Sequence, residues 1–170
     1  MKIRYISAGL AAAAALAIAG AGVAVADDYT ALLTDPNQVT DTLAYTPGAP
    51  TMNPAGQPGA SIVWNHRDGR TITDTVWVLA DPAAATAAIT AAQSTSGIAN
   101  PKIAQVPVGN GGTWVTGTNG AQSLSVLYFT QGNAAASIAF AGPIGDPVPS
   151  EIALELGQSQ AALIKNRMGG

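Results

Sequence analysis

The sequence predicts an α+β domain: a mainly antiparallel sheet of about five strands with two helices packed on one face. Two observations lead to this prediction. Segments rich in Val, Ile, Thr and aromatic residues follow one another, joined mostly by short turns that favour antiparallel pairing. Two other segments have helical composition and begin at capping residues, one after the second strand segment and one after the last.

The N-terminus has the order of a secretory signal peptide. Lys2 and Arg4 precede an apolar run rich in Ala and Gly, which ends at Ala24 and Ala26 just before Asp27. Small side chains at the first and third positions before the cut predict cleavage after Ala26. A retained membrane anchor is the alternative, but an Ala/Gly-rich run inserts only weakly. The predicted divisions are a signal peptide at 1–26, an N-terminal arm and Pro/Gly-rich loop at 27–60, and an α+β domain at 61–170.

The arm and the loop have weak local signals. Pro36 interrupts the apolar residues of 27–46, which predicts either two short helical turns or an irregular arm. The stretch TPGAPTMNPAGQPGAS, residues 46–61, has four prolines, three glycines and no hydrophobic period. It predicts an ordered surface loop, and a functional lid is the alternative.

The first strand pair and the first helix have clear signals. SIVWNH and RTITDTVWVL predict two strands, joined at Asp68-Gly69 by a tight turn whose central residues have positive φ. ADPAAATAAITAAQ predicts a helix because Asp81 can cap the first turn and Pro82 fits the first helical position.

A second group of strands and a closing helix complete the domain. Residues 102–108 predict an edge strand or a lead-in, since Pro107 cannot donate to a ladder. Residues 112–117 predict a short strand, and turns at Asn119-Gly120 and 131–133 separate AQSLSVLYF from its neighbours. AAASIAFAG is the last strand, and DPVPSEIALELGQSQAALIKNRM predicts a helix capped by Ser150.

Composition excludes several kinds of chemistry and partner. The chain has no cysteine, which excludes disulfides, thiolate metal sites and the lipid-carrying cysteine of a bacterial lipoprotein. The formal net charge is −3, and it becomes two units more negative when the signal leaves with Lys2 and Arg4. An acidic chain without a basic cluster argues against a nucleic-acid partner and, after cleavage, against a stable membrane anchor.

No catalytic or metal-binding set emerges from the sequence. His66, in the stretch WNHRDGR, is the only histidine, and no G-x-S-x-G motif exposes a serine nucleophile. We interpret this stretch as the solvated tip of a hairpin, where Arg67 and Arg70 are positive spots on an acidic surface. We predict no catalytic residue, no metal ligand and no cofactor. The acidic residues after the arm are scattered along the chain at Asp68, Asp74, Asp81, Asp146, Glu151 and Glu155.

Aromatic residues on the strands are the candidates for ligand binding. Core or sheet-face packing explains them equally well. The functional alternative is an apolar cleft between sheet and helices that holds a small ligand. The candidates are Trp64, Trp77, Trp114, Tyr128 and Phe140.

The last hundred residues resemble small exported proteins of mycobacteria and related actinobacteria. The resemblance depends on DGRTITDTVWVLADPAAATAAITAA and on VLYFTQGNAAASIAFAGPIGDPVPSEIALELGQSQAALIKN. Those proteins are of unknown function, so the resemblance implies no active-site residues. It implies a fold similar to the Mog1/PsbP-like α/β sandwich of some mycobacterial lipoproteins, from which this chain differs by lacking the lipidated cysteine.

These observations predict an exported, non-catalytic protein of the cell envelope or the external medium. We expect it to bind a small apolar ligand or an envelope protein. A hydrolase or isomerase that uses carboxylates without histidine is one alternative, and two acids converging in one pocket would distinguish it. A structural envelope protein is the other alternative.

Overall fold

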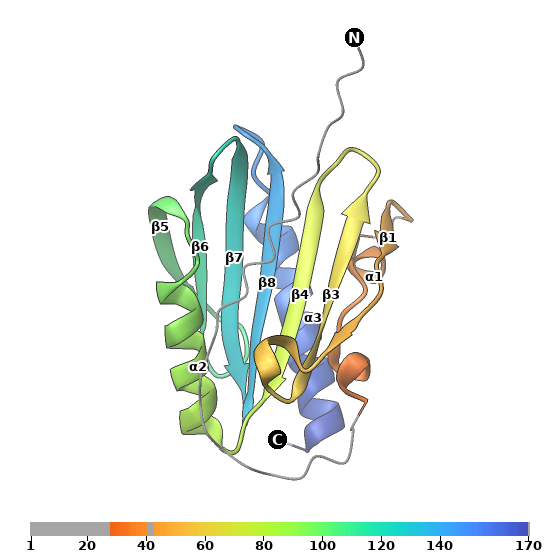
Figure 1. Ribbon diagram of the computed structural model, residues 1–170, viewed down its shortest axis with the longest axis vertical. Coiled ribbons are helices and arrows are strands. Elements are labelled where there is room, and N and C mark those ends of the chain that lie inside the picture. Colours follow the sequence, from red (N-terminus) through yellow and green to blue (C-terminus); the bar gives the residue numbers. More distant parts are fainter. Residues whose placement is uncertain (1–27, 41–42, 170) are drawn as a thin grey trace.

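Eight strands form a single antiparallel sheet in the order β1-β3-β4-β8-β7-β6-β5, and β2 pairs with β3 beside β1 (Figure 1). The structure is a computed structural model, and it describes residues 28–40 and 43–169. The predicted signal peptide and its cleavage site at Ala24 and Ala26 lie outside these residues. The α+β class and the antiparallel sheet are confirmed, but about five strands was too few. The strands are β1 (Tyr45–Pro47), β2 (Thr51–Met52), β3 (Gly59–His66), β4 (Thr71–Val78), β5 (Ala99–Val106), β6 (Gly112–Asn119), β7 (Gln122–Gln131) and β8 (Ala134–Pro143).

The two long helices cover opposite faces of the sheet, so the prediction of both on one face was wrong (Figure 1). The helices are α1 (Pro36–Thr40), α2 (Pro82–Ser94) and α3 (Ser150–Met168), three rather than two, with 3-10 turns η1 (Tyr29–Leu32) and η2 (Pro54–Gly56). Strand β7 explains the arrangement. Val126 and Tyr128 pack with α2, whereas Leu127 and Phe129 pack with α3. Since successive side chains of a strand point to opposite faces, a strand that is apolar throughout needs a cover on each side.

The predicted loop at 46–61 contains β1, β2 and η2. Both strands are short and pair with β3, where Pro47 is tolerated because it lies on an edge strand. Strand β3 begins at Gly59, two residues before the expected start. A Cβ at Gly59 would lie 2.0 Å from the carbonyl oxygen of Val76, so only glycine allows β4 to approach this closely.

The hairpin between β3 and β4 is confirmed, but its turn differs in detail. Positive φ occurs at Gly69 alone (φ 92°) and not at Asp68. The Gly69 N–H donates to the His66 carbonyl (3.0 Å) and the His66 N–H donates to the Arg70 carbonyl (2.8 Å). This is a three-residue loop with glycine in the left-handed position, the next most common hairpin class after the two-residue loop.

The helix starts were predicted with mixed success. The Asp81 side chain accepts a hydrogen bond from the Ala84 N–H (2.8 Å) and caps α2, as expected. Ser150 does not cap α3: it is the first helical residue, and Pro149 occupies the cap position without a side-chain bond. Among the described residues, no helix is long and apolar enough to cross a membrane.

The arm packs into the same core as the sheet and α3. Leu32 is 5% exposed and belongs to the cluster on the α3 face, and Val39 packs against that cluster. The Asn37 side chain bonds both backbone groups of Tyr45, donating to its carbonyl and accepting from its N–H, each at 3.0 Å. The arm is therefore continuous with the domain through buried side chains and backbone bonds.

Candidate functional site

The five aromatic candidates are divided between the two faces of the sheet. Trp64, Trp114 and Phe140 belong to the cluster on the α3 face, and the rings of Trp114 and Phe140 meet edge to face at 5.8 Å between centroids. Trp77 and Tyr128 belong to the α2 face, where burial raises the pKa of Tyr128 to about 12. The sheet separates these two groups, so the five residues do not line one cleft. A ligand-binding role for any of them stays a prediction.

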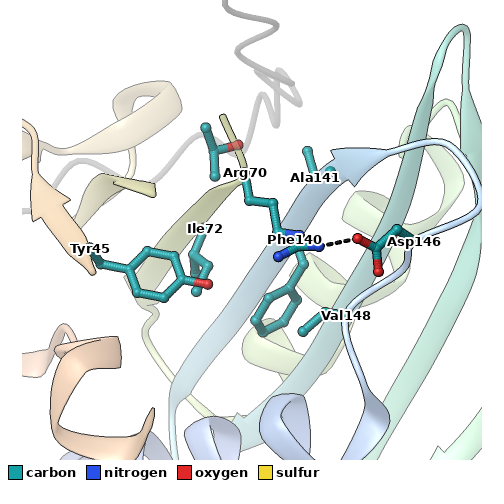
Figure 2. Close-up of a pocket in the computed structure, with 9 residues that line it drawn as sticks. Tyr45, Arg70, Ile72, Phe140, Ala141, Asp146 and Val148 are labelled. Atoms are coloured by element: carbon teal, nitrogen blue, oxygen red, sulfur yellow. Dashed lines mark hydrogen bonds and ion pairs between the residues drawn. The ribbon is translucent and has the colours of Figure 1, made fainter. Parts of the chain in front are cut away.

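A small pocket lies beside the end of the β3–β4 hairpin, and of the five candidates only Phe140 lines it (Figure 2). Its volume is about 20 Å³. Roughly 10–15 Å³ of such space is needed to hold one water molecule, so the pocket has room for a water or the tip of a side chain. It is lined by Tyr45, Arg70, Thr71, Ile72, Phe140, Ala141, Gly142, Asp146 and Val148.

Charged side chains form the rim of this pocket. Arg70 donates from one guanidinium nitrogen to Asp68 (2.8 Å) and from the other to Asp146, in the loop between β8 and α3 (Figure 2). The backbone N–H of Arg70, together with the His66 and Arg70 side chains, holds the pKa of Asp68 below its ordinary value. We had interpreted Arg70 as part of a solvated tip, whereas its side chain joins two loops that lie 76 positions apart in the sequence.

His66 is fixed in orientation by Asp68 and by an aromatic neighbour. Its Nδ1 lies 2.5 Å from an Asp68 carboxylate oxygen. The Asp68 N–H also donates to the same nitrogen (3.3 Å). The ring lies 4.9 Å from that of Tyr45, a half-buried residue whose pKa is raised by burial.

Two acids meet at Arg70, although only Asp146 lines the pocket. Two acids converging in one pocket were the expected sign of the carboxylate hydrolase alternative. However, Asp68 and Asp146 both bind the Arg70 guanidinium, and both are substantially exposed. An acid/base pair needs two different environments for its carboxylates, whereas these two share one arginine at the protein surface. In the part of the chain that the structure describes, no group of three or more His, Cys, Asp or Glu residues could hold a metal ion.

A separate buried acid lies deeper, between the sheet, the arm and α3. Asp74 on β4 is 1% exposed, and its two carboxylate oxygens accept from the Thr34 N–H (2.8 Å) and the Gln160 side-chain amide (2.6 Å). Burial raises its pKa to about 7 despite these two hydrogen bonds. Sequence reasoning placed Asp74 among scattered acids. The signal was present, because Asp74 alternates with Ile72 and Val76 and so shares their buried face.

Comparison with known proteins indicates the fold but no family. No protein-family model and no curated protein matches the chain. The crystal structure of the extracellular domain of PknH from Mycobacterium tuberculosis is similar, with a TM-score of 0.52 and 12% sequence identity, over 83% of this chain and 94% of that chain. At this identity the likeness concerns the fold alone. The Mog1/PsbP-like resemblance is not confirmed, and the fold is similar to that of a mycobacterial extracellular domain.

Proposed function

We propose that this protein is an exported, non-catalytic binding domain that recognises a protein partner through the Arg70 pocket. We define this pocket by its floor of Ile72, Phe140 and Val148 and its rim of Arg70 and Asp146. The observation behind the proposal is the combination of an apolar floor and a charged rim. Protein interfaces use this combination at their centres, where a pocket admits one apolar side chain and polar groups exclude water around it.

The size of the pocket favours a protein partner over a small apolar ligand. A volume of about 20 Å³ accepts the end of one side chain, and a protein supplies the rest of the contact from the surrounding surface. Ile144, 63% exposed in the loop that carries Asp146, is an apolar residue available for that surface.

Export is supported by the order of charges and apolar residues in the first 26 positions and by the fold shared with an extracellular domain. We expect the exported protein to begin at Asp27. Replacing Ala26 with arginine should abolish cleavage, since the site accepts only small residues, whereas Ala26→Gly should be processed. Mass spectrometry of the N-terminal peptide measures this, and an N-terminus at Met1 in the exported wild-type protein would contradict the prediction.

Site-specific photo-crosslinking tests the binding proposal. A benzophenone amino acid at position 144 lies in the loop that carries Asp146 and does not replace a residue that lines the pocket. In cells that make the protein, we expect a discrete covalent adduct with one envelope or extracellular protein. The matched control places the same group at Thr86, exposed on α2 and on the other face of the sheet. No adduct from position 144, or the same adduct from both positions, would contradict the proposal.

A further inference from the structure

The buried polar cluster of Asp74, Gln160 and Thr34 joins three separate parts of the chain. The Thr34 N–H and the Gln160 side-chain amide both donate to the Asp74 carboxylate. The Gln160 amide also donates to the Leu32 carbonyl (3.3 Å). Each side chain is almost fully buried, with exposures of 1% for Asp74, 0% for Gln160 and 6% for Thr34. The polar bonds that join Leu32 and Thr34 to the sheet and α3 therefore involve one acid and one amide.

The cluster also contains hydrogen-bond acceptors that are not used. The Gln160 Oε1 and the Thr34 Oγ1 are buried without a hydrogen-bond partner. An ionised carboxylate can only accept hydrogen bonds, whereas a protonated one also donates. A protonated Asp74 has one O–H to donate, so it could satisfy one of these two oxygen atoms, and buried polar atoms left unpaired are costly.

No positive charge compensates Asp74 in the part of the chain that is described. The charged residues of α3 are exposed, and strands β4 and β8 hold no cation. Asp35, beside Thr34 in the arm, accepts instead from the Asn37 N–H (2.9 Å). The ionisable groups on the elements packed around the cluster are Asp28, Asp35, His66, Glu151, Glu155, Lys165 and Arg167.

We propose that residues 29–40 form a pH-sensitive flap, closed on β4 and α3 while Asp74 carries a proton and loosened when Asp74 ionises. Opening the flap removes the Thr34 and Leu32 backbone groups from the cluster and lets water reach the carboxylate. An ionised Asp74 gains the most from this hydration, because a buried charge without a counter-ion is strongly disfavoured. Residues 29–40 contribute no strand to the sheet, so the flap can separate from β4 and α3 while the strand pairing of β4 is kept.

The direction of the pH effect follows from linkage. In the closed state the pKa of Asp74 is about 7, and in the open, hydrated state we expect the ordinary value near 3.8. Below pH 4 both states bind the proton and the flap is most firmly closed. Between pH 4 and 7 the open state has lost the proton that the closed state keeps, so the opening constant should rise about tenfold per pH unit. Above pH 7 both states are ionised and the opening constant should level off.

Hydrogen exchange measured by mass spectrometry on the exported protein tests the flap, with rates corrected for intrinsic exchange at each pH. In the wild type, protection of peptides from 29–40 should fall by two to three orders of magnitude from pH 4 to 7, on the order of tenfold per unit. At every pH, protection of peptides from 29–40 should stay below that of peptides from β7, because the flap opens without global unfolding. The fall should disappear in Asp74→Asn and persist in Asp35→Asn, the matched control on the arm itself. Constant protection of 29–40 in the wild type, or an unchanged fall in Asp74→Asn, would overturn the proposal.

A second measurement covers the case in which Asp74→Asn does not fold. The carboxyl carbon of Asp74 can be titrated by nuclear magnetic resonance in the wild-type protein. A midpoint near 7 accompanied by shift changes in residues 29–40 supports the flap. A midpoint near 4, or a titration that leaves those residues unchanged, overturns it.

Discussion

Replacing Phe129 with alanine should lower the free energy of unfolding by about 3–5 kcal/mol. Phe129 is 1% exposed and lies in the α3-face cluster with Leu127 and Leu156, both as deeply buried. The cost combines the lost burial of the ring with the cavity that it leaves, since the surrounding sheet and helix cannot collapse fully around the gap. Urea denaturation monitored by circular dichroism measures the difference.

The matched control is Ile103→Ala on the edge strand β5. Ile103 is 65% exposed, so its removal should change the free energy of unfolding by less than about 0.5 kcal/mol. If the two substitutions cost the same, Phe129 does not lie in a packed core and the arrangement of α3 on this face is wrong.

The stability of the wild-type protein should fall by about 4 kcal/mol between pH 4 and pH 7 through Asp74 alone, since each unit of pKa difference is worth about 1.4 kcal/mol. The folded-state pKa of about 7 lies above the ordinary value of 3.8, so the folded protein holds a proton that the unfolded chain releases. The stabilising contribution of Asp74 is therefore fully present below pH 4 and decreases as the pH rises to 7. Above pH 7 the free energy of unfolding no longer changes through this residue. Carboxylates that are stabilised in the ionised form by salt bridges act in the opposite sense, which makes the direction diagnostic.

Denaturant unfolding at several pH values measures this slope, and the Asp74→Asn variant isolates it. Asparagine keeps one oxygen acceptor and loses the other, so it should cost about 1–3 kcal/mol at pH 4. Asp74→Asn should also remove most of the decrease in the free energy of unfolding between pH 4 and 7, whereas Asp35→Asn should retain that decrease. A wild-type protein whose stability rises between pH 4 and 7 would contradict the burial of an uncompensated acid at this position.

Local sequence signals predicted most of the helices and strands, whereas the pairing of some strands could not be predicted from the sequence. Asp81 and Gly69 each determine backbone geometry within a few residues, so the first long helix and the hairpin were predicted correctly, although the turn differs in detail. The edge strand predicted at 102–108 exists but spans Ala99–Val106, so Pro107 lies just after it. Strands β1 and β2 have no hydrophobic period because they only extend the edge of β3 through backbone bonds. No local pattern predicts such pairing.

The placement of the helices could have been predicted. Residues 126–129 are consecutive, apolar and all buried, which requires a cover on both faces of β7. The alternation of side chains along β4 likewise predicts that Asp74 is buried. Gln160 lies four residues after Leu156 and therefore on the buried side of α3. By contrast, nothing near Arg70 indicates Asp146, because only the tertiary fold brings the two loops together.

The central claim is that the Arg70 pocket binds a protein partner, and the yield of the position-144 crosslink in two arginine variants tests it most directly. Arg67 and Arg70 lie in the same hairpin, but Arg70 lines the pocket and Arg67 is exposed without a salt bridge to any described residue. Neither Arg67→Ala nor Arg70→Ala should cost more than about 1 kcal/mol of stability, because exposed ion pairs contribute little. Thermal unfolding checks this.

Truncating an arginine at the centre of an interface reduces the binding free energy by about 2 kcal/mol or more. We therefore predict that Arg70→Ala reduces the crosslink yield at limiting partner concentration by at least about tenfold, while Arg67→Ala leaves it unchanged. Equal yields from the two folded variants would show that the partner does not use this pocket, and the proposed function would then be wrong.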